Sequence, residues 1–311
     1  MLKKRDRINS VSSVSSQTRG AKKLRKTSDL DILVDGVADI IQAEKDDFQK
    51  FGISDHVAEK LRAKNINSLF AVQKKVFVPL ESGKNVICAS LTGSGKTLSF
   101  VLPLITRYKE SFIQNKPVIM VIAPTRELSI QVGREFSDLN CDGFKFKTVM
   151  VYGGVSIEDQ IYKLRAGCDI IVGTPGRIMD MIERTELTLK NIKACVLDEA
   201  DKMLNMGFLE DIEKIFGKIH TSRRHTQVCL FSATIEGWVK DVAKRIMINK
   251  HDDNAKNEEE LKPVFIDLIK DLGGRTPKTV QHLAVNTMKH DRVMTIADLS
   301  KFFYIFIYSN F

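Results

Sequence analysis

Two short segments carry residues whose types and spacing suit the chemistry of phosphates. One is a glycine-rich turn that consists of Thr92, Gly93, Ser94, Gly95, Lys96 and Thr97. In such a turn the backbone N–H groups cradle phosphates, the lysine reaches the β- and γ-phosphates, and the last hydroxyl faces Mg²⁺. About a hundred residues later the apolar pair Val196-Leu197 ends in Asp198-Glu199-Ala200-Asp201. A carboxylate at the end of a buried strand can hold Mg²⁺ while its neighbour polarises a water, so the two segments predict a site that hydrolyses a nucleoside triphosphate.

The glycine-rich turn lies in the sequence context that a phosphate loop requires. It follows the apolar run Val86-Ile87-Cys88 and leads into an apolar stretch from Leu98 to Ile105. A strand therefore precedes the turn and a helix follows it, so that the phosphates meet unpaired N–H groups at a helix N-terminus. The strict pattern begins with glycine, and the small residue Ser90 stands at that position here.

Short β-branched runs alternate with segments suited to helices along most of the chain. These runs are Val86–Cys88, Val118–Ala123, Thr148–Tyr152, Asp169–Gly173, Ala194–Asp198 and Val228–Ser232. Continuous apolar strands separated by helices predict an α/β fold with a mostly parallel sheet and helices on both faces. Ligands of such sheets bind at the carboxyl ends of the strands, which is where both phosphate segments are expected.

Positive charge is concentrated at the start of the chain. The whole chain has a net charge of +9, and residues 1–28, with nine lysines and arginines and one acid, hold +8 of it. This serine-rich segment cannot bury enough apolar surface to fold, so we predict a disordered basic tail over residues 1–43. The basic run from Lys22 to Lys26 suits a nuclear address or a nonspecific phosphate clamp. A mitochondrial transit peptide and a merely solubilising tail are the alternatives.

The cysteines and the hydropathy of the chain indicate in which cellular environment the protein is expected. The five cysteines form no CxxC pair, and Cys88, Cys195 and Cys229 lie in apolar runs. We interpret these three as small core side chains rather than as metal ligands or disulfides. No apolar run approaches the roughly 18 residues of a membrane span, and no secretory signal precedes the body. A soluble intracellular protein with no membrane partner is therefore expected.

From about Phe48 to Thr234 the chain resembles the N-terminal RecA-like domain of the DEAD-box ATP-dependent RNA helicases. The resemblance rests on the phosphate loop, on the four residues from Asp198 to Asp201, and on further motifs in the family order. It implies a RecA-like P-loop NTPase fold with ATP and Mg²⁺ as ligands. It also implies that Asp198 holds Mg²⁺ through water and that Glu199 positions the nucleophilic water, with Lys96 as the third catalytic residue.

The resemblance also implies a surface for RNA. Pro124-Thr125-Arg126-Glu127, Gly153-Gly154 and Thr174-Pro175-Gly176-Arg177 match the family's RNA-contact motifs. Each lies at the end of a predicted strand, where glycine permits close backbone approach and N–H groups can meet RNA phosphates without selecting a base sequence. Ser232-Ala233-Thr234 matches the motif that couples hydrolysis to duplex opening, and we expect it to hydrogen bond to the acidic motif through Asp201.

Phe48 and Gln73 occupy the positions of the family's adenine-reading aromatic and glutamine. An aromatic ring can stack on the base while a side-chain amide donates to and accepts from the adenine edge. Core packing for Phe48 and a plain helix surface for Gln73 are the alternatives. The segment from Leu69 to Val72 reads Leu-Phe-Ala-Val instead of the usual Pro-Thr-Pro-Ile, so the family's hydroxyl that touches the phosphate loop is absent. This form resembles the nucleolar Gu-type subgroup.

The domain organisation follows from composition and length. Residues 44–250 are predicted to form the RecA-like ATP-binding domain, and a polar stretch from Asn249 to Leu261 suggests its exit. Only 61 residues follow Lys250, fewer than the roughly 100 of an independent domain. Residues 251–311 are therefore expected to be a linker and the truncated start of a second RecA-like domain. The last ten residues contain six aromatics and are interpreted as a strand without its sheet.

These features predict an RNA-stimulated ATPase that clamps and locally unwinds RNA duplexes, present here mainly as its first RecA-like domain. One alternative is a nucleotide- and RNA-binding fragment with little turnover, because the family's second domain supplies the arginines that complete the ATP site. Another is a P-loop ATPase that acts on DNA. The predicted partner is RNA, bound through its backbone, and protein partners stay open. The nucleus, including the nucleolus, is the expected compartment, with the cytoplasm and the mitochondrion as alternatives.

Overall fold

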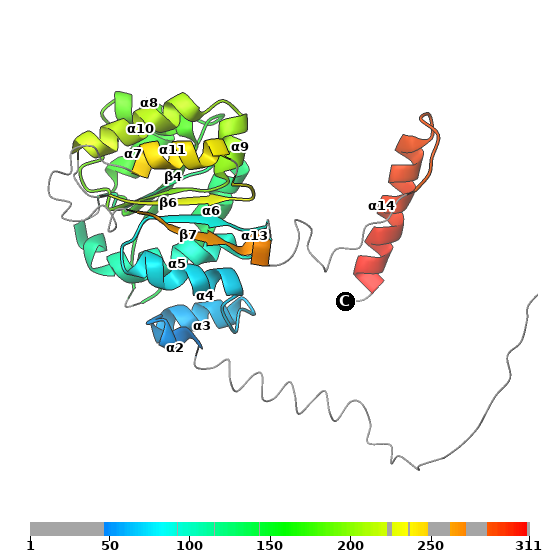
Figure 1. Cartoon of the computed structure of the whole chain (residues 1–311), viewed down its shortest axis with the longest axis horizontal. Helices are drawn as coiled ribbons and strands as arrows, with labels where there is room; N and C mark the ends of the chain where they lie inside the picture. Colours follow the sequence, from blue (N-terminus) through cyan, green and yellow to red (C-terminus); the bar gives the residue numbers. More distant parts are fainter. Residues whose placement is uncertain are drawn as a thin grey trace, which may run out of the picture. The chain divides into compact units, whose positions relative to one another are not determined.

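The structure is a computed structural model that describes residues 47–91, 93–114, 116–142, 144–222, 226–235, 237–247, 262–271 and 285–309. The predicted tail over residues 1–43, the linker from Asn249 to Leu261 and Thr92 of the phosphate loop lie outside these residues. Within the part of the chain that is described, one sheet with helices on both of its faces carries every predicted motif (Figure 1).

The sheet has seven strands in the order β3-β4-β2-β5-β6-β1-β7, and all neighbouring pairs are parallel. The strands are β1 (Val86–Ala89), β2 (Ile119–Ile122), β3 (Thr148–Val151), β4 (Ile170–Gly173), β5 (Ala194–Leu197), β6 (Gln227–Ser232) and β7 (Val264–Asp267). The first six coincide with the six predicted runs. Every residue of β1, β2, β4, β5 and β6 is buried. This burial is expected because helices cover both faces of a parallel sheet. The predicted α/β fold is confirmed.

Two groups of helices cover the two faces of the sheet. One face packs against α2 (Asp47–Lys50), α3 (Asp55–Ala63), α4 (Ala71–Glu81), α5 (Lys96–Tyr108), the 3-10 helix η1 (Lys109–Gln114) and α6 (Arg126–Asp138). The other packs against α7 (Ile157–Arg165), α8 (Pro175–Glu183), α9 (Ala200–Asn205), α10 (Leu209–Ser222) and α11 (Gly237–Met247). Figure 1 shows α8, α10 and α11 on one side of the sheet and α3, α4 and α5 on the other. Each group forms its own apolar core, and the buried cysteines 88, 195 and 229 belong to these cores as predicted.

Several helix starts are encoded by the residues at their first turn. The Thr125 side chain accepts a hydrogen bond from the Leu128 N–H at 3.2 Å and caps α6. Ser156 caps α7 in the same way, and Pro175 is the first residue of α8. The Thr125 and Ser156 side chains accept hydrogen bonds from N–H groups of the first turn, and Pro175 has no N–H group that needs a partner. The motifs after β2 and β4 therefore start helices that point their N-termini at the carboxyl edge of the sheet.

The first domain extends beyond its predicted end at residue 250. β7 pairs in parallel with β1, with Val264 opposite Val86 and Asp267 opposite Ala89, and α13 (Leu268–Asp271) follows it. The predicted boundary is therefore too early. β7 is the edge strand of the sheet, and none of its four residues is fully buried, although Val264, Phe265 and Ile266 form a short apolar run.

The aromatic end of the chain is helical where the sequence predicted a strand. α14 spans Arg292–Ser309, and no described strand includes these residues. A helix pairs its interior backbone N–H and C=O groups within the segment, whereas a strand needs a neighbour. The β propensity of aromatic and β-branched residues reflects packing in a sheet, so it does not decide the structure without one. Among the described helices, none is long and apolar enough to cross a membrane.

Candidate functional site

The strand order sorts the motifs into two adjoining groups at the carboxyl edge of the sheet. Ser90, Asp198 and Ser232 follow or end the neighbouring strands β1, β5 and β6, while the three predicted RNA motifs follow β2, β3 and β4. Backbone hydrogen bonds continue past the strand ends. The Ser90 N–H donates to the Ser232 carbonyl at 3.1 Å, and the Asp198 N–H donates to the Ile122 carbonyl at 3.0 Å. The starts of the motifs are therefore held in register with their neighbours.

The phosphate loop is held in a glycine-specific conformation. Gly95 has φ +85° and lies at the start of α5, and a Cβ built on it would lie 2.7 Å from both Gln73 Nε2 and Phe70 Cδ2. Larger residues are therefore excluded by backbone conformation and by contact. The Ser90 and Ser94 hydroxyls form a hydrogen bond of 2.8 Å. Ser90, which stands where the strict pattern has glycine, therefore stabilises the loop through Ser94.

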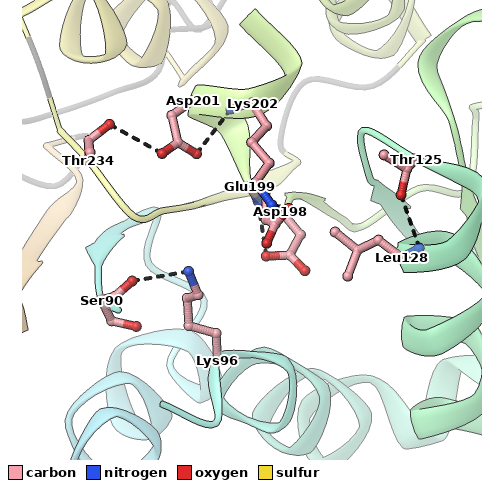
Figure 2. A network of polar contacts seen from close by, with 9 residues as sticks. All are labelled: Ser90, Lys96, Thr125, Leu128, Asp198, Glu199, Asp201, Lys202 and Thr234. Atoms are coloured by element: carbon pink, nitrogen blue, oxygen red, sulfur yellow. Dashed lines mark hydrogen bonds and ion pairs between the residues drawn. The ribbon is translucent and has the colours of Figure 1, made fainter. Parts of the chain in front are cut away.

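The Lys96 side chain is buried and points toward the residues of this loop. It is only 7% exposed, and its Nζ donates to the Ser90 carbonyl at 3.0 Å. In Figure 2 it points from α5 toward Ser90, while Asp198 and Glu199 stand at the end of β5. A lysine ammonium held beside the backbone N–H groups of a loop and a helix start creates a positive site that suits a polyphosphate.

The two predicted catalytic carboxylates differ in their surroundings. Asp198 is 3% exposed and its Oδ1 accepts from the Glu199 N–H at 3.0 Å. Burial raises the pKa of the Asp198 carboxyl to about 6, and the positive charge of Lys96 opposes that rise. Glu199 has φ +52°, an uncommon value for a residue with a side chain. The Glu199 carboxylate forms an ion pair with Lys202 Nζ at 2.8 Å. The left-handed backbone of Glu199 makes a turn between β5 and α9, so Asp198 and Glu199 both lie at the end of β5.

The donors at this edge suit Mg²⁺. No cluster of three or more His, Cys, Asp or Glu side chains that could hold a metal was found among the described residues. Mg²⁺ prefers one or two protein oxygens together with water and phosphate oxygens. The buried Asp198 carboxylate and the Thr97 hydroxyl at the start of α5 are oxygen donors of this kind, and a bound cation would offset the cost of the buried charge.

Replacing Asp198 with asparagine is expected to stabilise the protein when nucleotide and metal are absent. The carboxyl pKa is 3.8 ordinarily and about 6 in the folded protein, so the folded state holds the proton more tightly. Stability therefore falls as the pH rises through this range, and the charged form costs about 3 kcal/mol above it. Thermal unfolding in a chelator should show a higher Tm for the variant at about pH 7.5, and the gain should vanish below about pH 4. An equal Tm gain at both pH values would contradict this explanation.

The predicted coupling motif contacts the acidic motif directly. The Thr234 hydroxyl donates to Asp201 Oδ2 at 3.2 Å (Figure 2). The Ser232 hydroxyl in turn donates to the Thr234 carbonyl at 2.6 Å, and the Lys202 N–H donates to Asp201 Oδ1 at 3.1 Å. The expected hydrogen bond between the two motifs is confirmed, and it links the end of β6 to the start of α9.

Cationic side chains of the RNA motifs are held against the loop after β3. The Arg126 guanidinium lies 5.1 Å from the centroid of the Tyr152 ring. Arg177 donates from both terminal nitrogens to the Val155 carbonyl at 3.3 Å. The three motifs therefore form one surface around Gly153 and Gly154, which are both exposed. Tyr152 was not predicted as part of this site, although an aromatic directly before Gly-Gly at a strand end was a signal for it.

The two predicted adenine-reading side chains are both buried in this structure. Phe48 is fully buried in the core, with the Arg62 guanidinium 5.6 Å from its ring centroid. Gln73 is 2% exposed: its Oε1 accepts from the Phe70 N–H at 2.7 Å, and its Nε2 donates to the Gly95 carbonyl at 3.2 Å. In this structure Phe48 is a core residue and Gln73 ties α4 to the phosphate loop. The role of both side chains toward adenine stays a prediction.

A cavity of about 810 Å³ lies elsewhere in the domain. Its lining includes Lys147 and Asp169, which precede β3 and β4, and Lys60 of α3. These residues are at the amino ends of the strands, opposite the edge that carries the motifs. Ligands of parallel sheets bind at the carboxyl ends, so this cavity is separate from the candidate site.

Comparison with known proteins adds independent findings. A family model described as DEAD/DEAH box helicase matches residues 70–242. The chain is 37% identical over 268 residues to nucleolar RNA helicase 2 from Rattus norvegicus, covering 83% of this chain and 32% of that protein. It is also 37% identical over 272 residues to DEAD-box ATP-dependent RNA helicase 7 from Arabidopsis thaliana, covering 85% of this chain and 38% of that protein. The chain thus spans about a third of the length of the curated relatives it matches.

A solved structure is similar in fold. It is a DEAD box protein from the hyperthermophile Methanococcus jannaschii, with a TM-score of 0.61 and 33% sequence identity. The match covers 79% of this chain and 61% of the other. At this identity the likeness supports the RecA-like fold.

Proposed function

Because this chain belongs to the DEAD/DEAH box helicase family, we propose that it acts as the first RecA-like domain of an ATP-dependent RNA helicase. The observation that carries the proposal is the sheet order β3-β4-β2-β5-β6-β1. It brings the nucleotide motifs together on three neighbouring strands and the RNA motifs together on the next three. Hydrolysis and RNA binding then share one continuous edge, as an ATP-driven RNA clamp requires.

The nucleotide half of the edge binds ATP through the phosphate loop. The N–H groups from Gly93 to Thr97 and the Lys96 ammonium neutralise the phosphates. Mg²⁺, when bound, would neutralise developing charge on the phosphates, with Thr97 and Asp198 as its protein-side partners. Glu199 orients the attacking water and accepts its proton. The Glu199 carboxylate also pairs with Lys202 Nζ at 2.8 Å, so Lys202 helps to hold it at the end of β5.

The coupling contact lies within the nucleotide half of the edge and connects the segment after β6 to the turn after β5. Thr234 holds Asp201 at the first turn of α9, directly after Glu199. A shift of the Ser232–Thr234 segment would therefore move the turn that aims Glu199. We propose that RNA binding reaches the hydrolytic carboxylate by this contact.

The RNA half of the edge binds the RNA backbone. Arg126 and Arg177 supply positive charge, and Gly153 and Gly154 leave room for close approach of phosphates. Contacts with phosphates carry no sequence information, so binding independent of base sequence is expected. The presence of nucleolar RNA helicases among the relatives supports a nuclear, and more finely nucleolar, location.

A second candidate is a chain that binds ATP and RNA but turns ATP over slowly by itself. It is favoured by the match to about a third of each relative, because in this family the second RecA-like domain supplies the arginines of the ATP site. An arginine of that kind is worth about a thousandfold or more in turnover. Both candidates bind ATP and RNA, and they differ in the rate of ATP hydrolysis.

The test of the proposed function is ATP hydrolysis measured with RNA and with DNA of the same base sequence. We expect saturating RNA to stimulate turnover, and DNA to do so far less, both in the chain as given and in a protein that adds a second RecA-like domain. A large rate increase on adding that domain would support the slow-fragment candidate for the chain alone. Equal stimulation by DNA would instead favour a P-loop ATPase that acts on DNA and would overturn the RNA assignment.

A further inference from the structure

The loop after β3 carries two adjacent glycines at the place where the predicted RNA motifs meet. Gly153 and Gly154 are both exposed, and glycines have much conformational freedom. The position of this loop therefore depends on contacts that its neighbours make. Tyr152, directly before the glycines, makes one set of contacts through its backbone and another through its ring.

A buried glutamine holds the backbone of Tyr152. Gln160 lies on α7 and is 4% exposed. Its Oε1 accepts from the Tyr152 N–H at 3.1 Å, and its Nε2 donates to the Tyr152 carbonyl at 3.0 Å. One side-chain amide thereby pairs both backbone groups of Tyr152, as a neighbouring strand would do in a sheet. Gln160 thus sets the point from which the glycine loop begins.

The ring of Tyr152 lies beside an exposed arginine of the RNA motifs. The Arg126 guanidinium is 5.1 Å from the centroid of the Tyr152 ring. A Cβ built on Gly154 would lie 3.6 Å from a terminal nitrogen of Arg126, so the guanidinium also lies next to the glycine loop. The ring carries no net charge, so this contact leaves the positive charge of Arg126 available to a phosphate.

This arrangement lowers the cost of ordering the arginine. An exposed arginine side chain has many rotamers, and fixing it on a phosphate costs conformational entropy. A guanidinium that already lies against a ring has lost part of that freedom before RNA arrives, so less is lost on binding. Its N–H donors lie in the plane of the guanidinium and point outward. The ring can therefore raise RNA affinity without touching RNA.

We propose that Tyr152 is a positioning residue for RNA binding, which holds Arg126 in place for an RNA phosphate, and that Gln160 in turn holds Tyr152. This inference rests on the proposed function, because it assumes that RNA binds beside the glycine loop. Neither Tyr152 nor Gln160 belongs to the motifs that were predicted to contact RNA. Since contacts with phosphates carry no sequence information, Tyr152 affects the affinity for RNA and not the preference for a base.

The first measurement is the affinity of the full chain for a single-stranded RNA oligonucleotide, followed by fluorescence anisotropy. Tyr152→Leu should bind RNA about twofold to fivefold more weakly, which is the usual worth of an exposed cation–π contact. Tyr152→Phe keeps the ring and should keep the affinity of the unmutated protein. Tyr162→Leu is the matched control, because it makes the same change at a 76% exposed tyrosine on α7, and it should have no effect.

The second measurement tests whether Tyr152 acts through Arg126. Arg126→Gln removes the charge and should weaken RNA binding by about tenfold or more, the worth of a hydrogen bond to a charged group. In that background Tyr152→Leu should cause no further loss, because residues that act as one unit are not additive. Gln160→Leu should weaken RNA binding about as much as Tyr152→Leu, and it too should have no effect beside Arg126→Gln.

Mg-ATP affinity is the control for folding. The phosphate loop follows β1, and four strands separate β1 from β3 in the sheet. Every variant should therefore bind Mg-ATP as the unmutated protein does. Loss of both ligands in Gln160→Leu would show a general role in folding and would overturn the role of Gln160, while the pair Tyr152→Leu and Tyr152→Phe would still test Tyr152.

The outcomes separate this inference from the proposed function. Unchanged RNA affinity in Tyr152→Leu, or an equal loss with and without Arg126, would overturn the positioning role of Tyr152. An equal loss in Tyr152→Phe would do the same, because the ring is then not what matters. If the unmutated chain binds RNA and Arg126→Gln has no effect, the inference fails while RNA binding stands. If the unmutated chain binds no RNA, the proposed function itself fails.

Discussion

Glu199→Gln is expected to lower ATP hydrolysis by about a hundredfold to ten-thousandfold, the usual worth of a positioned general base, while ATP binding is retained. Glutamine keeps the size of the side chain but cannot accept the proton of the attacking water. Glu199 is placed for this role by its left-handed turn at the end of β5, next to the buried Asp198. Single-turnover hydrolysis at saturating RNA measures the effect, in the chain and in a protein that also contains a second RecA-like domain.

A control must separate loss of the base from loss of the ion pair with Lys202. Lys202→Gln breaks the same 2.8 Å contact but leaves the Glu199 carboxylate in place, so hydrolysis should stay within a few-fold of the unmutated rate. Glu210→Gln, which changes an exposed acid on α10, should have no effect. Normal hydrolysis in Glu199→Gln would show that another group activates the water.

Lys96→Ala is expected to weaken ATP binding by at least about thirtyfold, because removal of one partner from a buried charge pair costs about 2 kcal/mol or more. Lys96 is 7% exposed and already points into the loop through its bond to the Ser90 carbonyl. Its loss leaves the phosphates with N–H groups alone. Equilibrium binding of Mg-ATP measures the change.

Two comparisons make the Lys96 result specific. Lys84→Ala removes an exposed lysine near the amino end of β1, at the opposite edge of the sheet, and should bind ATP normally. A nucleotide-free Tm for Lys96→Ala is also needed, because the charge of Lys96 opposes the rise of the Asp198 pKa. A correctly folded Lys96→Ala protein with unchanged ATP affinity would remove Lys96 from the site.

The inner strands and the phosphate loop are local features, and the sequence alone was sufficient to predict them. A strand buried on both faces needs a continuous apolar, β-branched run, and β2 and β5 coincide with such runs. The loop likewise depends on residues that are adjacent in the chain, above all on Gly95 with its positive φ. The contact between Thr234 and Asp201 was expected only from the resemblance to the family's coupling motif, and the pairing of β5 with β6 brings the two segments together.

The local sequence did not determine which side chains are exposed or what forms the edge of the sheet and the end of the chain. Phe48 has the position of a base-stacking aromatic, yet the packing of the core around it leaves no exposed surface. Phe70 stands where the family has a hydroxyl, and only the folded structure shows that its ring lies against Gly95 of the phosphate loop. The place of β7 at the edge of the sheet depends on its pairing with β1, which is distant in the sequence. α14 was mispredicted because β propensity carries little weight without a neighbouring strand.

The arrangement of the site depends on a strand order that the chain order does not contain. The six motif-bearing strands run from β1 to β6 along the sequence but lie as β3-β4-β2-β5-β6-β1 in the sheet. Each is an apolar run that could pair with any other, so local propensity cannot choose its neighbours. Burial of both faces and the right-handed crossovers of parallel strands make that choice. The sequence by itself therefore determined which residues do chemistry, and the tertiary structure decided which of them meet.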